Sequence, residues 1–176
     1  VTTDQHYVYE ATDKHVEGTG IELAQDNIVS CVQCGLPVVQ ADIDHGLSGL
    51  TDRSFDYVIL SRTLQVIQRP DRVIREMLRV TKPGRNTCVH IAEITSTKQA
   101  HGVIGLIDLP GMVVRAYVEA GWTYHGRVCI DKDPQAQAIR THSKALLFVQ
   151  MRKDSSWSRP ALPDYILIFK KPGENL

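Results

Sequence analysis

Cysteine is scarce in this sequence, with four among 176 residues. That is too few for a disulfide scaffold, so we expect a reduced, cytoplasmic protein. Long apolar runs are also missing: the longest are short stretches such as residues 58–60 and 145–149, which excludes a transmembrane helix. The chain does not open with the charged, then apolar, then small-residue pattern of a signal peptide. With 43% hydrophobic and 23% charged residues, the composition predicts one ordinary globular domain over residues 1–176.

Net charge is absent as well, since 20 Lys and Arg balance 20 Asp and Glu. The net charge is zero because an acidic first half of the sequence cancels a basic second half. Residues 1–83 hold 8 basic and 12 acidic residues, a balance of −4, and residues 84–176 hold 12 basic and 8 acidic residues, a balance of +4. An overall zero argues against a polyanionic partner, but the basic second half leaves one open.

What is present is an alternation of short apolar strands with amphipathic helices. This pattern predicts βαβ units and therefore an α/β fold, a doubly wound, mostly parallel Rossmann-like sheet covered on both faces. The continuous apolar run at residues 57–60 indicates a strand buried on both sides. We expect strands at residues 19–23, 37–40, 55–60, 87–91, 124–130 and 165–169, and helices at residues 5–16, 24–34, 70–80, 108–120 and 135–150.

Helix boundary signals support several of these assignments. Gly35 stands where a C-cap belongs, Pro70 lies in a first helical turn, and Asp108 can cap the helix that ends before Gly121. The segment KPG at residues 82–84 predicts a turn that ends the preceding helix.

Two expected strands end on carboxylates, Glu22 and Asp42. Ligands of open α/β sheets bind beyond the carboxyl ends of the strands, and a carboxylate there typically holds ribose hydroxyls. The alternative interpretation is a pair of solvated loop carboxylates.

The segments around these carboxylates carry a resemblance. The stretches GIEL at 20–23, QADIDHGL at 40–47, SFDYVILS at 54–61 and REMLRV at 75–80 resemble class I S-adenosylmethionine-dependent methyltransferases, and residues 17–80 resemble the MetW family. The resemblance implies that Glu22 holds the ribose of S-adenosylmethionine, that Asp42 and its neighbour Ile43 face the adenine, and that Ser61 lines the methyl-donor pocket.

From residue 82 onward the resemblance changes. The segments KPGR at 82–85, HGVIG at 101–105, DKDPQAQ at 131–137 and DSSWSR at 154–159 resemble phage-type DNA N4/N6 methylases, a match that extends to residue 176. This resemblance implies a DNA partner for the basic segment at residues 127–159, where Lys and Arg contact phosphates and a Trp stacks on a base. The candidate DNA-binding residues are Lys98, Arg127, Lys132, Arg140, Lys144, Arg152, Lys153, Trp157 and Arg159. The alternative is a solvated basic helix beside a structural Trp.

Two elements of those families are missing. No glycine-rich cofactor loop follows a strand, and residues 60–63 read LSRT where the (D/S/N)PP(Y/F) motif of amino-methylating DNA methylases belongs. Losing two or three backbone bonds to a charged ligand weakens binding by a factor on the order of 10². The first, central strand is also missing, because residues 6–10 lie too close to residue 19 for a parallel crossover. We therefore expect a rearranged sheet, or an edge open to a protein partner or a second copy.

Other candidate sites are weaker. The CxxC of Cys31 and Cys34 lies late in an amphipathic helix without two further ligands, so these are predicted to be helix-face or core cysteines and no metal is expected. The seven histidines show neither metal spacing nor a recognisable catalytic triad, and His90 is interpreted as a hydrogen-bonded core or pocket residue. No catalytic residue is assigned.

The sequence thus predicts a methyltransferase-like protein, nearest to DNA amino-methyltransferases, with weak S-adenosylmethionine binding and weak or absent catalysis. The alternative is a non-catalytic binding module that uses the same fold, as a decoy, inhibitor or regulator of a phage, defence or methylation system.

Overall fold

The computed structural model describes residues 17–133 and 162–174, apart from residues 62, 65, 97 and 104. The chain divides into two compact units, Val1–His45 and Gly46–Leu176. The helices predicted at residues 5–16 and 135–150 lie outside the described residues. Among the helices described, none has the length and apolarity needed to cross a membrane.

The first unit is a small parallel βαβ element. Strand β1 pairs in parallel with β2, and helix α1 connects the two. Gly35 ends the connection in the left-handed region with φ of 72°, as expected for a glycine beyond a helix C-terminus. The predicted strands and helix are confirmed as β1 (Gly20–Glu22), α1 (Gln25–Gln33) and β2 (Val38–Gln40), followed by a short 3₁₀ turn, η1 (Ile43–His45).

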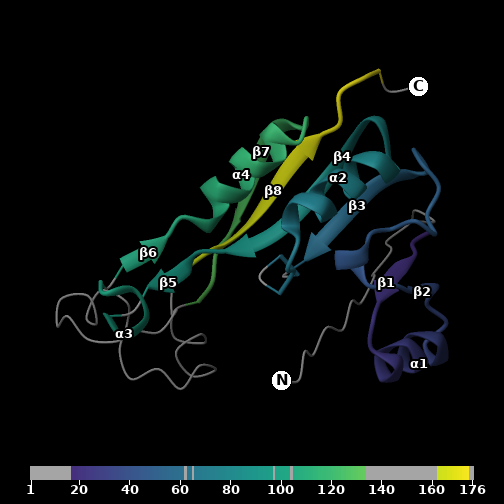
Figure 1. Cartoon of the computed structure of the whole chain (residues 1–176), viewed down its shortest axis with the longest axis horizontal. Coiled ribbons are helices and arrows are strands. Elements are labelled where there is room, and N and C mark those ends of the chain that lie inside the picture. Colours follow the sequence, from purple (N-terminus) through teal and green to yellow (C-terminus); the bar gives the residue numbers. More distant parts are fainter. Residues whose placement is uncertain are drawn as a thin grey trace. The chain divides into compact units, whose positions relative to one another are not determined.

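The second unit is built on a four-stranded sheet in the order β3-β4-β8-β7 (Figure 1). The strands are β3 (Phe55–Ser61), β4 (Thr81–Ala92), β7 (Thr123–Ile130) and β8 (Asp164–Lys170). Strands β3 and β4 are parallel, whereas β8 is antiparallel to both of its neighbours. The amino end of β8 therefore lies beside the carboxyl end of β4, where Ala92 pairs with Asp164.

Helices α2 (Pro70–Val80) and α4 (Leu109–Glu119) pack against each other as well as against the sheet. The indole nitrogen of Trp122, just after α4, donates to the carbonyl of Ile74 in α2 at 3.3 Å. Beneath them, the rings of Tyr117 and Phe169 stack with centroids 4.1 Å apart, and both residues are fully buried. This aromatic pair anchors the core of the second unit.

The boundaries of these helices follow the predicted signals. Helix α2 begins at Pro70, and Asp108 caps α4 by accepting a hydrogen bond from the backbone N–H of Gly111 at 2.8 Å. A Cβ on residue 111 would overlap the Asp108 carboxylate, so glycine permits the cap.

The KPG segment at residues 82–84 is not the turn that was predicted. Helix α2 does end at Val80, but β4 begins at once with Thr81, and residues 82–84 belong to the strand. The backbone N–H of Gly84 donates to the carbonyl of Lys171, and its φ of 71° bends the chain within the strand.

A small antiparallel hairpin was not predicted. Strands β5 (Ile94–Ser96) and β6 (Gly105–Ile107) pair across the short helix α3 (Lys98–His101). These strands are three residues long, too short for a periodic apolar signal.

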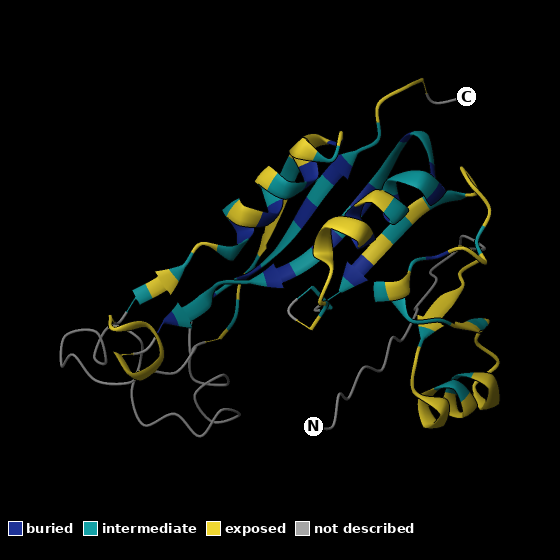
Figure 2. Ribbon diagram, viewed as in Figure 1, coloured by how far each residue is buried: buried dark blue, intermediate teal, exposed yellow. Residues whose placement is uncertain are grey.

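The prediction that β3 is buried on both faces is wrong. Val58 and Leu60 face the side that α2 and α4 cover, but Tyr57 and Ile59 point to the opposite face and are 62% and 60% exposed. Figure 2 shows the resulting alternation of colours along β3. Within the described residues, no helix covers the Tyr57 face, and β3 pairs with β4 alone. Among these described residues, the continuous apolar run therefore belongs to a strand that has one exposed face and is paired along one edge only.

Candidate functional site

Glu22 closes β1 and holds the start of α1. Its Oε1 accepts hydrogen bonds from the backbone N–H groups of Leu23 and Ala24 at 2.8 and 2.9 Å, and its Oε2 accepts one from Asn27 at 3.1 Å. Desolvation favours a higher pKa for Glu22, but these three hydrogen bonds outweigh it and lower the pKa. The side chain is therefore an anionic acceptor fixed in place at neutral pH.

Asp42 follows β2 and is held in a similar way. Its Oδ2 lies 2.7 Å from Nδ1 of His45, and its Oδ1 accepts the backbone N–H of Asp44 at 3.0 Å. The hydrogen bond with His45 is the main cause that lowers the pKa of Asp42, and the Asp44 N–H adds to it. Ile43, the next predicted site residue, opens η1 and is half-buried.

The parallel pairing brings the two carboxylates to the same edge of the first unit. Glu22 is the register partner of Gln40, and its carbonyl accepts the N–H of Ala41 at 3.2 Å. Asp42 is the next residue, so both carboxylates follow the carboxyl ends of adjacent parallel strands. That is the edge at which open α/β sheets bind nucleosides.

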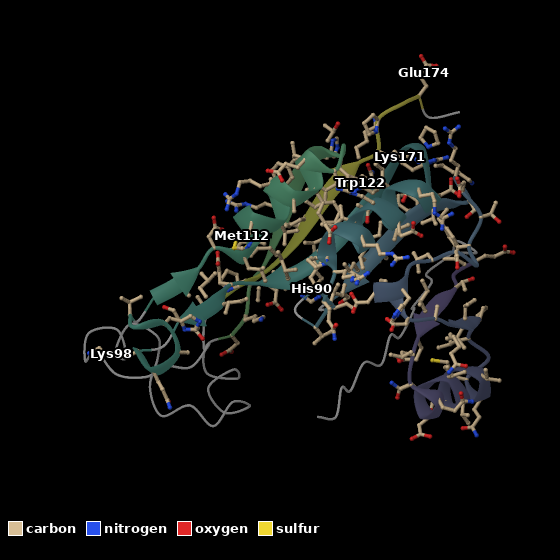
Figure 3. All side chains as sticks on the ribbon, viewed as in Figure 1. His90, Lys98, Met112, Trp122, Lys171 and Glu174 are labelled. Carbon is tan, nitrogen blue, oxygen red and sulfur yellow. The ribbon has the colours of Figure 1, made fainter. Side chains whose placement is uncertain are left out.

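Ser61, the fourth predicted cofactor residue, lies in the second unit at the carboxyl end of β3. Its Oγ is 3.1 Å from Nδ1 of His90 on β4, and its carbonyl accepts a hydrogen bond from the Thr63 hydroxyl at 2.8 Å. Nε2 of His90 is in turn 3.1 Å from Oδ2 of Asp164 at the start of β8. Figure 3 labels His90 at this end of the sheet.

His90 contacts side chains through both ring nitrogens, in agreement with its interpretation as a hydrogen-bonded core or pocket residue. Ser61, His90 and Asp164 are far apart in the chain, and only the β3-β4-β8 strand order brings them together. No motif marks such an arrangement, because its three members come from three different strands. The one signal available was a polar residue at or beside the predicted end of each strand.

Asp164 also pairs with a residue predicted to contact DNA. Nζ of Lys132 lies 2.5 Å from Oδ1 of Asp164, and the Lys132 and Asp164 side chains are only 17% and 4% exposed. The ammonium group of Lys132 thus compensates a buried carboxylate.

Two further candidate DNA-binding residues are described, and both are exposed. Lys98 begins α3, and Arg127 lies on β7 with its guanidinium 5.5 Å from the centroid of the Tyr165 ring. Lys98 thus belongs to α3 and Arg127 to β7, while Lys132 follows β7. The remaining candidates lie outside the described residues: Arg140, Lys144, Arg152, Lys153, Trp157 and Arg159.

Glu93, which the sequence did not single out, follows the carboxyl end of β4. Burial raises its pKa, the charge of Asp108 raises it further, and that of Arg127 lowers it. Its Oε2 is buried and has no hydrogen-bond partner among the described residues.

The four cysteines are not joined to one another by disulfide bonds. All four are free thiols, with Cys31 half-buried in α1 and Cys34 exposed at its C-cap. In the part of the chain that the structure describes, no three His, Cys, Asp or Glu side chains gather as a metal site would require.

Comparison with known proteins supports a methyltransferase relationship. Residues 4–91 match the family described as methionine biosynthesis protein MetW. A curated relative, the bifunctional methionine biosynthesis protein MetXA/MetW of Rhodopirellula baltica, is 43% identical over 70 residues. That match covers 40% of this chain but only 11% of the relative, so the matched segment spans about a tenth of that protein.

Solved structures with the same fold include methyltransferases of several kinds. A methyltransferase from Haloferax volcanii, solved in complex with the Trm112 methyltransferase activator, matches 91% of this chain and 73% of its own at a TM-score of 0.64 and 16% identity. A DNA modification methylase from Thermus thermophilus, complexed with S-adenosyl-L-methionine, matches 77% of this chain and 53% of its own at a TM-score of 0.56 and 16% identity. These likenesses show the fold. The chain belongs to the MetW family and has the Rossmann-like fold of class I S-adenosylmethionine-dependent methyltransferases.

Proposed function

We propose that this methyltransferase-like protein binds S-adenosylmethionine through Glu22 and Asp42, at the carboxyl edge of β1 and β2. The observation that carries the proposal is the placement of two anionic carboxylates, held by backbone N–H groups, after adjacent parallel strands. Carboxylate oxygens accept hydrogen bonds, which suits the ribose hydroxyls and the adenine amino group of the ligand. Glu22 is assigned the ribose, and Asp42 with Ile43 the adenine.

The residues fit the nucleoside half of the ligand better than the methionine half. The lowered pKa values of Glu22 and Asp42 keep both groups charged at neutral pH. Because the sequence has no glycine-rich loop to supply further backbone donors, we expect binding about 10²-fold weaker than in a complete site, and weak or absent catalysis.

Thermal unfolding with added ligand tests the proposal. S-adenosylmethionine or its demethylated product at up to millimolar concentration is expected to raise the melting temperature, because a ligand that binds the folded state stabilises it. Asp42→Ala should remove the shift. Asp26→Ala, which deletes an exposed carboxylate from the first turn of α1, should retain it. The absence of a shift in the wild-type protein would refute S-adenosylmethionine binding.

For the methyl acceptor we propose duplex DNA, contacted by the basic segment. The support is the exposure of Lys98 and Arg127 together with the surplus of basic residues in the second half. Binding of a fluorescent duplex should weaken as the salt concentration rises. Lys98→Ala and Arg127→Ala should each reduce by about 1 the slope of the logarithm of the binding constant against the logarithm of the salt concentration. Lys132 is not counted among these DNA contacts, since Asp164 already pairs with its ammonium. A duplex that does not bind at low salt would contradict the assignment.

A second candidate function is a non-catalytic binding module, and the open face and edge of β3 favour it. Tyr57 and Ile59 present exposed apolar surface there. A protein partner is consistent with the curated relative, which is named as a bifunctional MetXA/MetW protein, and with the Haloferax methyltransferase solved with an activator. Sedimentation velocity should show a dimer or a heterocomplex that Ile59→Lys disrupts. A strictly monomeric, cooperatively unfolding protein would contradict strand sharing.

A further inference from the structure

The chain of side chains Ser61–His90–Asp164 goes beyond what nucleoside binding requires. A serine that only lines a pocket needs no histidine, and a histidine that only fills a core needs no buried carboxylate behind it. Here each of the two links is a 3.1 Å contact between side-chain atoms. The three residues come from β3, β4 and β8, whose mutual register fixes their positions.

The buried carboxylate determines which nitrogen of His90 carries the proton. Asp164 is 4% exposed and paired with Lys132, so it is ionised and can only accept a hydrogen bond. Nε2 of His90 must therefore be the protonated nitrogen in the neutral ring. Nδ1 then keeps its lone pair and accepts the hydroxyl proton of Ser61. This is the arrangement in which a histidine acts as a base toward a serine.

The position of these three side chains in the fold is suitable for reaction with a ligand. Ser61 is the last residue of β3, and His90 lies near the end of β4, so both stand at the carboxyl edge of the parallel strands. Ser61 and His90 are both partly exposed, with the His90 side chain at 22%, whereas the Asp164 side chain is only 4% exposed. The orienting carboxylate is therefore the most sheltered of the three groups.

We propose that Ser61 is a nucleophile toward small carboxylic esters, with His90 as its general base and Asp164 as the residue that orients His90. Ser61 Oγ bonds to the acyl carbon while its proton moves to Nδ1 of His90. The ester C–O bond then breaks, and the leaving alcohol takes the proton from Nδ1. Water repeats the sequence on the acyl-serine, which releases the carboxylic acid and restores the Ser61 hydroxyl. The activity needs no bound S-adenosylmethionine, so it stands or fails independently of the proposed function.

Covalent labelling tests the nucleophile directly in the wild-type chain. A fluorophosphonate probe forms a Ser–O–P bond as fluoride leaves, and peptide mass spectrometry locates the modified residue. We expect label on Ser61 and hydrolysis of p-nitrophenyl acetate above the buffer rate. Because the mapping needs no variant, a chain with no label on Ser61 overturns the proposal whether or not the variants fold.

Matched variants distinguish a Ser61 hydroxyl that His90 activates from one that is simply accessible to the probe. Ser61→Ala should abolish labelling at that position, and His90→Asn should slow it by about 10²–10⁴-fold, the usual contribution of a positioned general base. Ser54→Ala and His125→Asn change an exposed serine and an exposed histidine outside the chain of three and should leave the rate unchanged. If folded His90→Asn, verified by circular dichroism, labels Ser61 within twofold of the wild-type rate, His90 is not the base and the proposal fails.

Discussion

Ser61 and His90 are register partners on neighbouring parallel strands, and their side chains meet at 3.1 Å. The contact joins the carboxyl ends of β3 and β4, and Asp164 extends it to β8. At the far end of β8, Lys171 instead donates to the carbonyls of Leu78 and Thr81 at 2.5 and 2.7 Å, and Figure 3 labels it well away from His90. At one end of this sheet Lys171 thus contacts backbone carbonyls, whereas the other end carries the hydrogen-bonded side chains of Ser61, His90 and Asp164.

Loss of Lys132 should destabilise the second unit. Lys132→Met keeps the volume of the side chain but removes the Lys132 ammonium from the buried Asp164 carboxylate, at a cost of about 3–5 kcal/mol in the free energy of unfolding. Urea unfolding measures the change. Lys170→Met, at a half-buried lysine with no ion pair among those the structure records, is the control. A loss below about 1 kcal/mol would mean that Asp164 does not depend on Lys132.

Glu76 should make the second unit sensitive to acid. The Arg79 guanidinium, aided by the backbone N–H of Leu47, holds the pKa of Glu76 below its usual value of 4.5. A lowered folded-state pKa gives stability that is fully present above the unfolded value and is lost as the pH decreases through the folded value. Glu76→Gln should therefore lower the free energy of unfolding at pH 7 by about 1–3 kcal/mol and flatten its decline below pH 4.5. Denaturant titrations from pH 7 to pH 3 test this, with exposed Glu119→Gln as a control that leaves the acid profile unchanged.

The two faces of β3 should respond differently to substitution. Leu60 is 6% exposed, so Leu60→Ala should cost about 2–5 kcal/mol through lost burial and a residual cavity. Ile59 is 60% exposed, and Ile59→Thr, which keeps a β-branched side chain, should cost about 0.5 kcal/mol or less. Chemical denaturation of both variants measures the contrast. Equal losses would show that the Tyr57 face is covered in solution.

The cap of α4 offers a fourth measure of stability. Asp108→Ala removes the acceptor for the Gly111 N–H and should lower the free energy of unfolding by about 1 kcal/mol. Asp108→Ser, which can still cap, should remain close to the wild type. If both variants unfold like the wild type, the cap does not contribute to the fold.

Much of the fold was predictable because its signals are local. Pro70, Asp108 and Gly35 act within one helical turn, and each marked its boundary correctly. The carboxylates Glu22 and Asp42 were found for a similar reason, since a residue directly after a short strand lies at the sheet edge whatever its neighbours are.

The remaining features depend on pairing between distant segments. The antiparallel placement of β8 between β4 and β7 leaves no trace in the order of helices and strands, and it alone brings Asp164 to His90. The exposure of Tyr57 could not be read from an apolar run, which looks the same whether or not a helix covers the face. Lys132 looked like a phosphate ligand because its carboxylate partner is 32 residues away in sequence.

Calorimetric titration of the 176-residue protein with S-adenosylmethionine, with and without duplex DNA, tests the central claim most directly. We expect saturable binding of one ligand per chain, weak enough to require high ligand concentration, retained in Asp26→Ala and lost in Asp42→Ala. A wild-type protein that takes up no S-adenosylmethionine at millimolar concentration, alone or with DNA, would contradict it.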